Sequence, residues 1–149
     1  MKCAMELMAT AAVRAEELAR EKAERAKREE EERVERAKRE AEANIKETLI
    51  LCEKIGAEFE KQANAGKKYL IYTVKCDKYY RPLAEGTKYA NGSQSYFTFG
   101  KALNLKIMAN WFANYCFEIK LYKSSYREYG CGYRDGYEVV ITPAPSCIN

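Results

Sequence analysis

The segment from Arg14 to Glu42 constrains the fold of this chain more than any other part of it. Of its 29 residues 21 are charged, 10 basic and 11 acidic, and none is glycine, proline or aromatic. Such a segment cannot supply a core, but without helix breakers it favours a solvated α-helix. A glutamate precedes a basic residue by four positions in six pairs, each of which adds roughly 0.2–0.5 kcal/mol to an isolated helix. These pairs are Glu16–Arg20, Glu21–Arg25, Glu24–Arg28, Glu29–Arg33, Glu32–Arg36 and Glu35–Arg39.

An eleven-residue repeat runs through this segment, because the sequence of residues 24–29 recurs unchanged at residues 35–40. Eleven residues in three turns give about 3.67 residues per turn, so an apolar stripe with this repeat stays nearly straight. The stripe is mostly alanine, which buries little apolar area, and Val34 is its only larger member between Leu18 and Ile45. Two interpretations follow. The segment is either a solvated helical arm, or a weak coiled coil or partner-bound helix that also permits weak homo-oligomerisation.

The helix acquires a larger apolar face in residues 45–64, at spacings of three and four, which predicts packing on a core. The members of this face are Ile45, Leu49, Cys52, Ile55 and Phe59. The glycine at position 66 is a typical helix end. A helix of residues 2–64 would be about 95 Å long, longer than a small domain needs, so we expect a projecting arm. The predicted division is a charged helical arm at 1–44 and a domain at 45–149.

The rest of the chain alternates strand and helix patterns. The predicted elements are a strand at 69–76, a loop or hairpin at 77–92 with its turn at Asn91-Gly92, a short strand at 95–99, a helix at 101–116, a strand at 117–122, and strands at 126–133 and 137–142 joined by a turn at Asp135-Gly136. We therefore predict an α+β fold. A long charged N-terminal α-helix precedes a small domain whose mainly antiparallel sheet packs on two helices.

The chain contains no histidine. This excludes His-based nucleophile relays, histidine general acid/base catalysis and His-ligated zinc. The six cysteines form no C-x-x-C pair, so we expect neither a metal nor a cofactor. Because the N-terminus does not resemble a secretion signal and no run approaches about 18 apolar residues, we expect a cytoplasmic protein with reduced, mostly buried thiols.

Tyrosine and positive charge are concentrated in the C-terminal part. All 12 tyrosines lie between Tyr69 and Tyr137, and residues 48–149 carry 14 Lys and Arg against 9 Asp and Glu, a net charge of +5. Tyrosine and arginine are enriched at protein-binding hot spots, and the same mixture suits stacking on bases, although tyrosine also fills half-buried sheet positions. The predicted partner-binding residues are Tyr79, Tyr80, Arg81, Lys120, Tyr122, Lys123, Tyr126, Arg127, Tyr129, Tyr133 and Arg134.

The sequence contains only weak signals for catalytic residues. Glu118-Ile119-Lys120 fits the E-x-K fragment of metal-dependent nucleases, with Asp77 or Glu85 as a second carboxylate, but an alternating strand also places charges two residues apart for solubility alone. Cys131, between two glycines, is an expected turn residue, and without histidine it lacks a base. We therefore expect no catalytic residue.

These observations favour a non-catalytic protein-interaction protein, with direct DNA or RNA binding as the alternative and a metal-dependent nuclease third. Small histidine-free proteins with this layout occur among phage-encoded inhibitors of host enzymes, including CRISPR nucleases. That analogy of architecture suggests an inhibitor or adaptor acting on a nucleic-acid enzyme or ribonucleoprotein. No membrane partner is expected.

Overall fold

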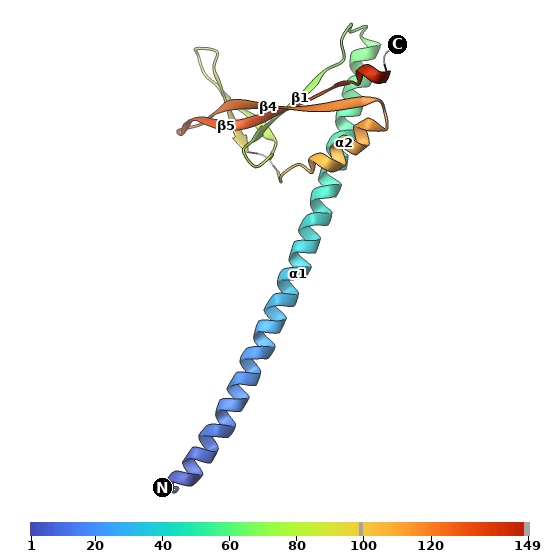
Figure 1. The fold of residues 1–149 in the computed structure, drawn as a ribbon. Helices are drawn as coiled ribbons and strands as arrows, with labels where there is room; N and C mark the ends of the chain where they lie inside the picture. Colours follow the sequence, from blue (N-terminus) through green and yellow to red (C-terminus); the bar gives the residue numbers. More distant parts are fainter. Residues whose placement is uncertain (99, 148–149) are drawn as a thin grey trace. The chain divides into compact units, whose positions relative to one another are not determined.

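The computed structural model describes residues 1–98 and 100–147 (Figure 1). Its elements are α1 (Ala4–Asn64), β1 (Tyr72–Asp77), β2 (Leu83–Lys88), β3 (Gln94–Thr98), α2 (Leu105–Ala113), β4 (Phe117–Glu128), β5 (Gly132–Pro143) and the 3₁₀ turn η1 (Pro145–Cys147). This order confirms the predicted α+β class. The chain divides into two compact units, Met1–Ala41 and Glu42–Asn149, where the sequence predicted a division between residues 44 and 45.

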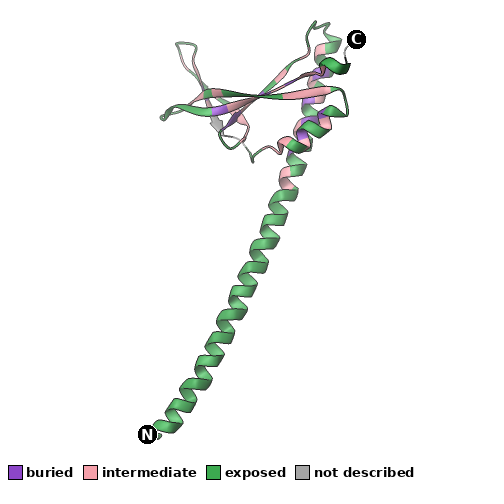
Figure 2. Ribbon diagram, viewed as in Figure 1, coloured by how far each residue is buried: buried purple, intermediate pink, exposed green. Residues whose placement is uncertain are grey.

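In the N-terminal unit every residue of α1 is exposed (Figure 2). Among the described residues, only Glu35–Arg39 of the six predicted pairs has its charged atoms within 4.0 Å. Two further pairs form at a spacing of three instead. Each basic side chain can pair with several acidic residues three or four positions away, and these ion pairs have nearly equal energies. The sequence therefore predicts the helix but not which acidic residue each basic side chain pairs with. The three pairs are Arg14–Glu17 at 3.1 Å, Glu30–Arg33 at 2.6 Å and Glu35–Arg39 at 3.4 Å.

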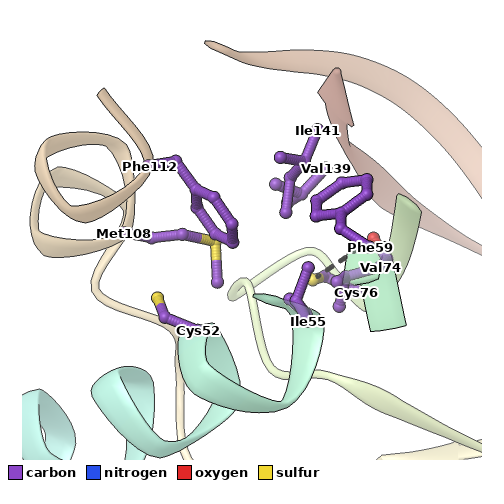
Figure 3. Close-up of a cluster of buried hydrophobic side chains, with 9 residues drawn as sticks. All are labelled: Cys52, Ile55, Phe59, Val74, Cys76, Met108, Phe112, Val139 and Ile141. Atoms are coloured by element: carbon purple, nitrogen blue, oxygen red, sulfur yellow. Dashed lines mark hydrogen bonds between the residues drawn. The ribbon is translucent and has the colours of Figure 1, made fainter. Parts of the chain in front are cut away.

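The core of the C-terminal unit is one cluster of buried side chains from two helices and two strands (Figure 3). The apolar face predicted for residues 45–64 supplies the contribution of α1. Aromatic rings extend the cluster toward β4, where Phe59 stacks on Phe117 with ring centroids 4.5 Å apart. The members are Cys52, Ile55 and Phe59 of α1, Val74 and Cys76 of β1, Met108 and Phe112 of α2, and Val139 and Ile141 of β5.

The main sheet is antiparallel and has the strand order β1-β5-β4, so β4 is an edge strand. β2 and β3 form a separate hairpin whose turn lies at Asn91-Gly92, as predicted; the last residue of the predicted strand 95–99 lies outside the described residues. The hairpin contacts the far end of β4, where Arg127 Nη1 donates a hydrogen bond of 2.9 Å to Ser93 Oγ. The guanidinium also lies 4.9 Å from the centre of the Tyr89 ring.

Several predicted boundaries were wrong for local reasons. The helix predicted at 101–116 is Leu105–Ala113, because the Asn104 side chain accepts a hydrogen bond from the backbone of Ile107 and caps its start. The strand predicted at 69–76 is Tyr72–Asp77, because the side chain of Gln62 holds both the N–H and the C=O of Ile71. Of the two alternatives for residues 77–92, the structure forms the hairpin, with β2 as its first strand, and β4 is one strand through residue 128.

The turn predicted at Asp135-Gly136 was also wrong. Both residues lie inside β5, and the chain reverses instead at residues 129–131, where the N–H of Cys131 donates to the C=O of Glu128 at 3.1 Å. Gly130, in that turn, has φ +74°, a backbone conformation that favours glycine. Asp135 is therefore not explained by a turn.

The thiols differ sharply in accessibility. The cysteines are free, but only Cys52 and Cys76 are buried, so the expectation of mostly buried thiols was wrong. The four exposed cysteines precede α1 or lie in the α2–β4 connection, the β4–β5 turn and η1, where no core is available: Cys3, Cys116, Cys131 and Cys147.

We expect Cys52 and Cys76 to resist thiol reagents in the native protein. Burial raises the pKa of Cys52 to about 11, and burial together with the charge of Asp77 raises that of Cys76 to about 12. At pH 8 at most about one buried thiol in a thousand is ionised, and only the thiolate reacts. Titration with a chromogenic disulfide should therefore find four accessible thiols in the native state and six in denaturant. Cys116 should be slower than an isolated exposed thiol, because its hydrogen bond to Cys147 raises its pKa. Six accessible thiols in the native state would contradict this packing.

Candidate interaction site

The turn after β1 is organised by one buried carboxylate. Asp77 is 1% exposed, and its Oδ1 accepts hydrogen bonds of 2.9 Å from the backbone N–H groups of Tyr79 and Arg81. Its Oδ2 accepts a 2.7 Å hydrogen bond from Nε of Arg81. The backbone closes the same turn, since the N–H of Asp77 donates to the C=O of Arg81 at 3.0 Å. These bonds fix the backbone of the turn at Tyr79 and Arg81 and the guanidinium of Arg81.

Tyr80 supports this turn from the other side. It has φ +60°, rare for a residue with a side chain, and its ring stacks on Tyr137 with centroids 4.7 Å apart. Partial burial and the neighbouring Tyr137 raise the pKa of Tyr80. We therefore assign Tyr80 to the packing of the turn, although it was predicted as a partner-binding residue.

The turn and the outer end of the β4–β5 hairpin enclose a polar cleft of about 360 Å³, which we call the Asp77 cleft. Two of its tyrosines are open to solvent, Tyr79 at 58% and Tyr133 at 77% exposure. Tyr126 is partly buried, and this burial, followed by the charge of Asp77, raises its pKa. The cleft is lined by Asp77, Lys78, Tyr79, Arg81, Tyr126, Glu128, Tyr133, Arg134 and Asp135.

The charges of the cleft balance one another. Its lining contains three basic and three acidic side chains, so its net charge is zero. Arg81 is paired with Asp77 at 2.7 Å, and Arg134 with Glu128 at 3.1 Å. Hydrogen bonds to Cys131 and Glu128 raise the pKa of Arg134. The Lys78 ammonium lies 5.0 Å from the centre of the Tyr79 ring. The cleft therefore presents aromatic rings and paired charges, and not an open positive patch.

The structure brings five of the eleven predicted partner-binding residues into this cleft: Tyr79, Arg81, Tyr126, Tyr133 and Arg134. Tyr129 lies exposed in the neighbouring β4–β5 turn, whereas Arg127 is engaged by the β2–β3 hairpin. Lys120, Tyr122 and Lys123 lie along β4 outside the cleft.

The sequence reasoning missed the organising role of Asp77, which it treated only as a possible metal ligand. The signal was present in Asp77-Lys78-Tyr79-Tyr80-Arg81. An aspartate at the start of a loop often accepts hydrogen bonds from the backbone N–H groups that follow it, and a basic residue four positions later can neutralise its charge.

The carboxylates of the nuclease hypothesis are not brought together. Glu118 pairs with Lys120 at 3.3 Å and lies opposite Thr142, whereas Asp77 lies opposite Gly136. Six residues of β5 separate these positions, about 20 Å at the rise of an extended strand. Glu85 pairs with Lys88 at 3.5 Å in the β2–β3 hairpin. In the part of the chain that the structure describes, no group of three potential ligands could hold a metal ion.

Comparison with known proteins adds no assignment: no family model, curated protein or solved structure matches this chain. Within residues 1–98 and 100–147, no helix is both long and apolar enough to cross a membrane.

Proposed function

We propose that this protein is a non-catalytic interaction protein whose Asp77 cleft binds another protein. The observation that carries the proposal is the exposure of Tyr79, on the turn organised by Asp77, and of Tyr133, on the β4–β5 hairpin across the cleft. A rigid tyrosine supplies a large contact area at low entropy cost, and Arg81 and Arg134 beside it supply directional hydrogen bonds. This combination is typical of a protein-binding hot spot.

The pairing of charges favours a protein over a nucleic acid as the partner. Binding to phosphates requires cations whose counterions can be released. In this cleft both arginines already have carboxylate partners, and the total charge of the lining is zero. A protein surface with hydrogen-bond acceptors and apolar side chains matches such a site better. The alternative, direct DNA or RNA binding, rests on the net charge of +5 of residues 48–149.

We further propose that the partner is a cytoplasmic nucleic-acid enzyme or ribonucleoprotein, on which this protein acts as an inhibitor or adaptor. The excess positive charge of residues 48–149 would be attracted to RNA or DNA bound to such a partner, while the cleft contacts its protein surface. The analogy of layout with small phage-encoded inhibitors, drawn from the sequence, suggests the same kind of partner.

Substitution of the exposed tyrosines tests the binding surface. The intact chain, immobilised and exposed to a bacterial lysate, should retain a partner, whose affinity is then measured with purified components. We expect Tyr79→Ala and Tyr133→Ala each to weaken it at least about 10-fold, as is usual for hot-spot tyrosines. Tyr69→Ala is a matched control, because Tyr69 is 75% exposed and lies outside the cleft. Equal loss in all three variants would contradict the assignment.

The dependence of affinity on salt concentration distinguishes a nucleic acid partner from a protein partner. If nucleic acid is the direct ligand, the affinity of the purified protein for free DNA or RNA should fall steeply between about 50 and 200 mM salt, whereas its affinity for the partner protein freed of nucleic acid should change little. Nucleic acid binding at low salt that is insensitive to Tyr79→Ala and Tyr133→Ala would favour the alternative and count against the cleft.

A further inference from the structure

A second surface of the C-terminal unit shares no residue with the Asp77 cleft. It is an apolar groove of about 500 Å³ between the end of α1, α2 and the start of β4. The core described above fills the space beneath it, because Phe59 and Phe112 belong to both. The groove is lined by Glu53, Gly56, Ala57, Phe59, Glu60, Ala63, Leu70, Trp111, Phe112, Tyr115 and Phe117.

Small residues of α1 create the hollow, and aromatic rings form its walls. Gly56 allows Trp111 to approach the helix, since a Cβ at this position would lie 3.2 Å from Cη2 of the indole. The rings of Trp111 and Tyr115 lie 4.8 Å apart, and Trp111 also meets Phe112 edge-on at 4.9 Å. Tyr115 remains 61% exposed. Tyr115 and Trp111 therefore present aromatic surface at the mouth of the groove, while Phe59 and Phe112 form its buried floor.

The charge of the groove is opposite in sign to that of the unit around it. Its only charged lining residues are Glu53 and Glu60, and the described residues supply no ion pair within 4.0 Å to either carboxylate. Because seven residues separate them, they lie on one face of α1, about 10 Å apart along its axis. Aromatic ring faces also attract cations. Two carboxylates beside aromatic rings make the groove selective for positive charge within a unit that is otherwise basic.

We infer that the groove binds a segment of a partner protein in which a bulky apolar side chain is flanked by lysine or arginine. The apolar side chain would fill the hollow above Gly56 and Ala57, and the flanking cations would pair with Glu53 and Glu60. Charge complementarity sets this occupant apart from an anionic lipid surface, which both carboxylates would repel. The inference goes beyond the proposed function, because it concerns a separate surface with a different chemical preference.

The chain carries its own reporter for the test, since Trp111 in the groove is its only tryptophan. The intact protein is titrated with two synthetic peptides that have no tryptophan. They share their leucine and alanine positions but carry either lysines or glutamates at the flanking positions. We expect the lysine peptide to change the Trp111 emission in a saturable way and to bind at least about 10-fold more tightly than the glutamate peptide. Equal affinities would overturn the proposal.

Variants distinguish peptide binding in this groove from a general effect of the charge of the protein. Glu53→Gln combined with Glu60→Gln should weaken binding of the lysine peptide about 10-fold, and Ala57→Leu should block it by filling the hollow. Glu24→Gln combined with Glu31→Gln is the matched control, because it removes the same charge at the same spacing from an exposed part of α1. If the control loses as much affinity, or if the emission change follows dimerisation of the chain in sedimentation, the inferred occupant is wrong. Tyr133→Ala should leave peptide binding unchanged, so the two proposed surfaces can fail independently.

Discussion

Gly136→Ala is expected to reduce the free energy of unfolding by about 3 kcal/mol or more, because it forces a methyl group between two paired strands. The new Cβ would lie well inside 3.0 Å of the carbonyl oxygen of Cys76 and 3.0 Å from Cδ1 of Tyr126. The carbonyl belongs to the backbone of β1, which is paired with β5 from Tyr72 to Asp77, so it cannot yield without separating the strands. Urea denaturation followed by circular dichroism measures the loss.

Gly130→Ala is the matched control in the same hairpin. Gly130 has φ +74° but nothing lies within 4 Å of its hypothetical Cβ, so the substitution costs only the conformational strain, about 1 kcal/mol. A smaller loss for Gly136→Ala than for Gly130→Ala would show that β1 does not approach β5 as closely as described.

Removal of the Asp77 carboxylate is expected to cause the second large loss in the free energy of unfolding. Asp77→Ala leaves the N–H groups of Tyr79 and Arg81 and the Arg81 guanidinium without their acceptor. Because the Arg81 side chain is 41% exposed, water replaces part of its lost hydrogen bond, and we expect a loss of about 2–4 kcal/mol from the unsatisfied donors together. Because the turn would no longer hold Tyr79, partner binding should be lost as well. Asp77→Asn keeps an oxygen acceptor and the side-chain shape, so its effect should be smaller, near the 1–3 kcal/mol of a weakened buried hydrogen-bond set.

The control for this prediction is Asp135→Ala in the same cleft. Asp135 is exposed, and among the described residues it has no ion pair within 4.0 Å, so its removal should change stability by less than about 0.5 kcal/mol. Comparable destabilisation by Asp77→Ala and Asp135→Ala would show that Asp77 does not organise the turn. Stability is again measured by urea denaturation.

The helices were predictable because their signals are local. Charge density and the absence of helix breakers indicate α1, and the three-and-four spacing that ends in Phe59 identifies its core-facing side. The Asn91-Gly92 turn is equally local, since a two-residue signal determines it. These features depend on residues that are close together in the chain, so one sequence is enough to predict them.

The path of β4 and β5 depends on contacts that are distant in sequence. Both Gly130 and Gly136 are plausible turn residues within an alternating pattern, and only the pairing of β5 with β1 decides between them. The same holds for the site. Tyrosine enrichment predicted a contact surface, but the sequence could not show that Tyr80 stacks on Tyr137 while Tyr79 faces solvent. The paired state of Arg81 also follows only from the folded turn.

The position of β4 at the sheet edge has a consequence for self-assembly. Among the described residues, no strand pairs with its outer edge, and the β2–β3 hairpin contacts only its far end. An open edge strand is a template on which another chain can add a strand and start aggregation. The middle of β4 carries Lys120 and Lys123, whose ammonium groups would repel each other in an edge-to-edge dimer that brings these positions together. We expect these two lysines, which the sequence also predicts as partner-binding residues, to disfavour such edge-to-edge pairing.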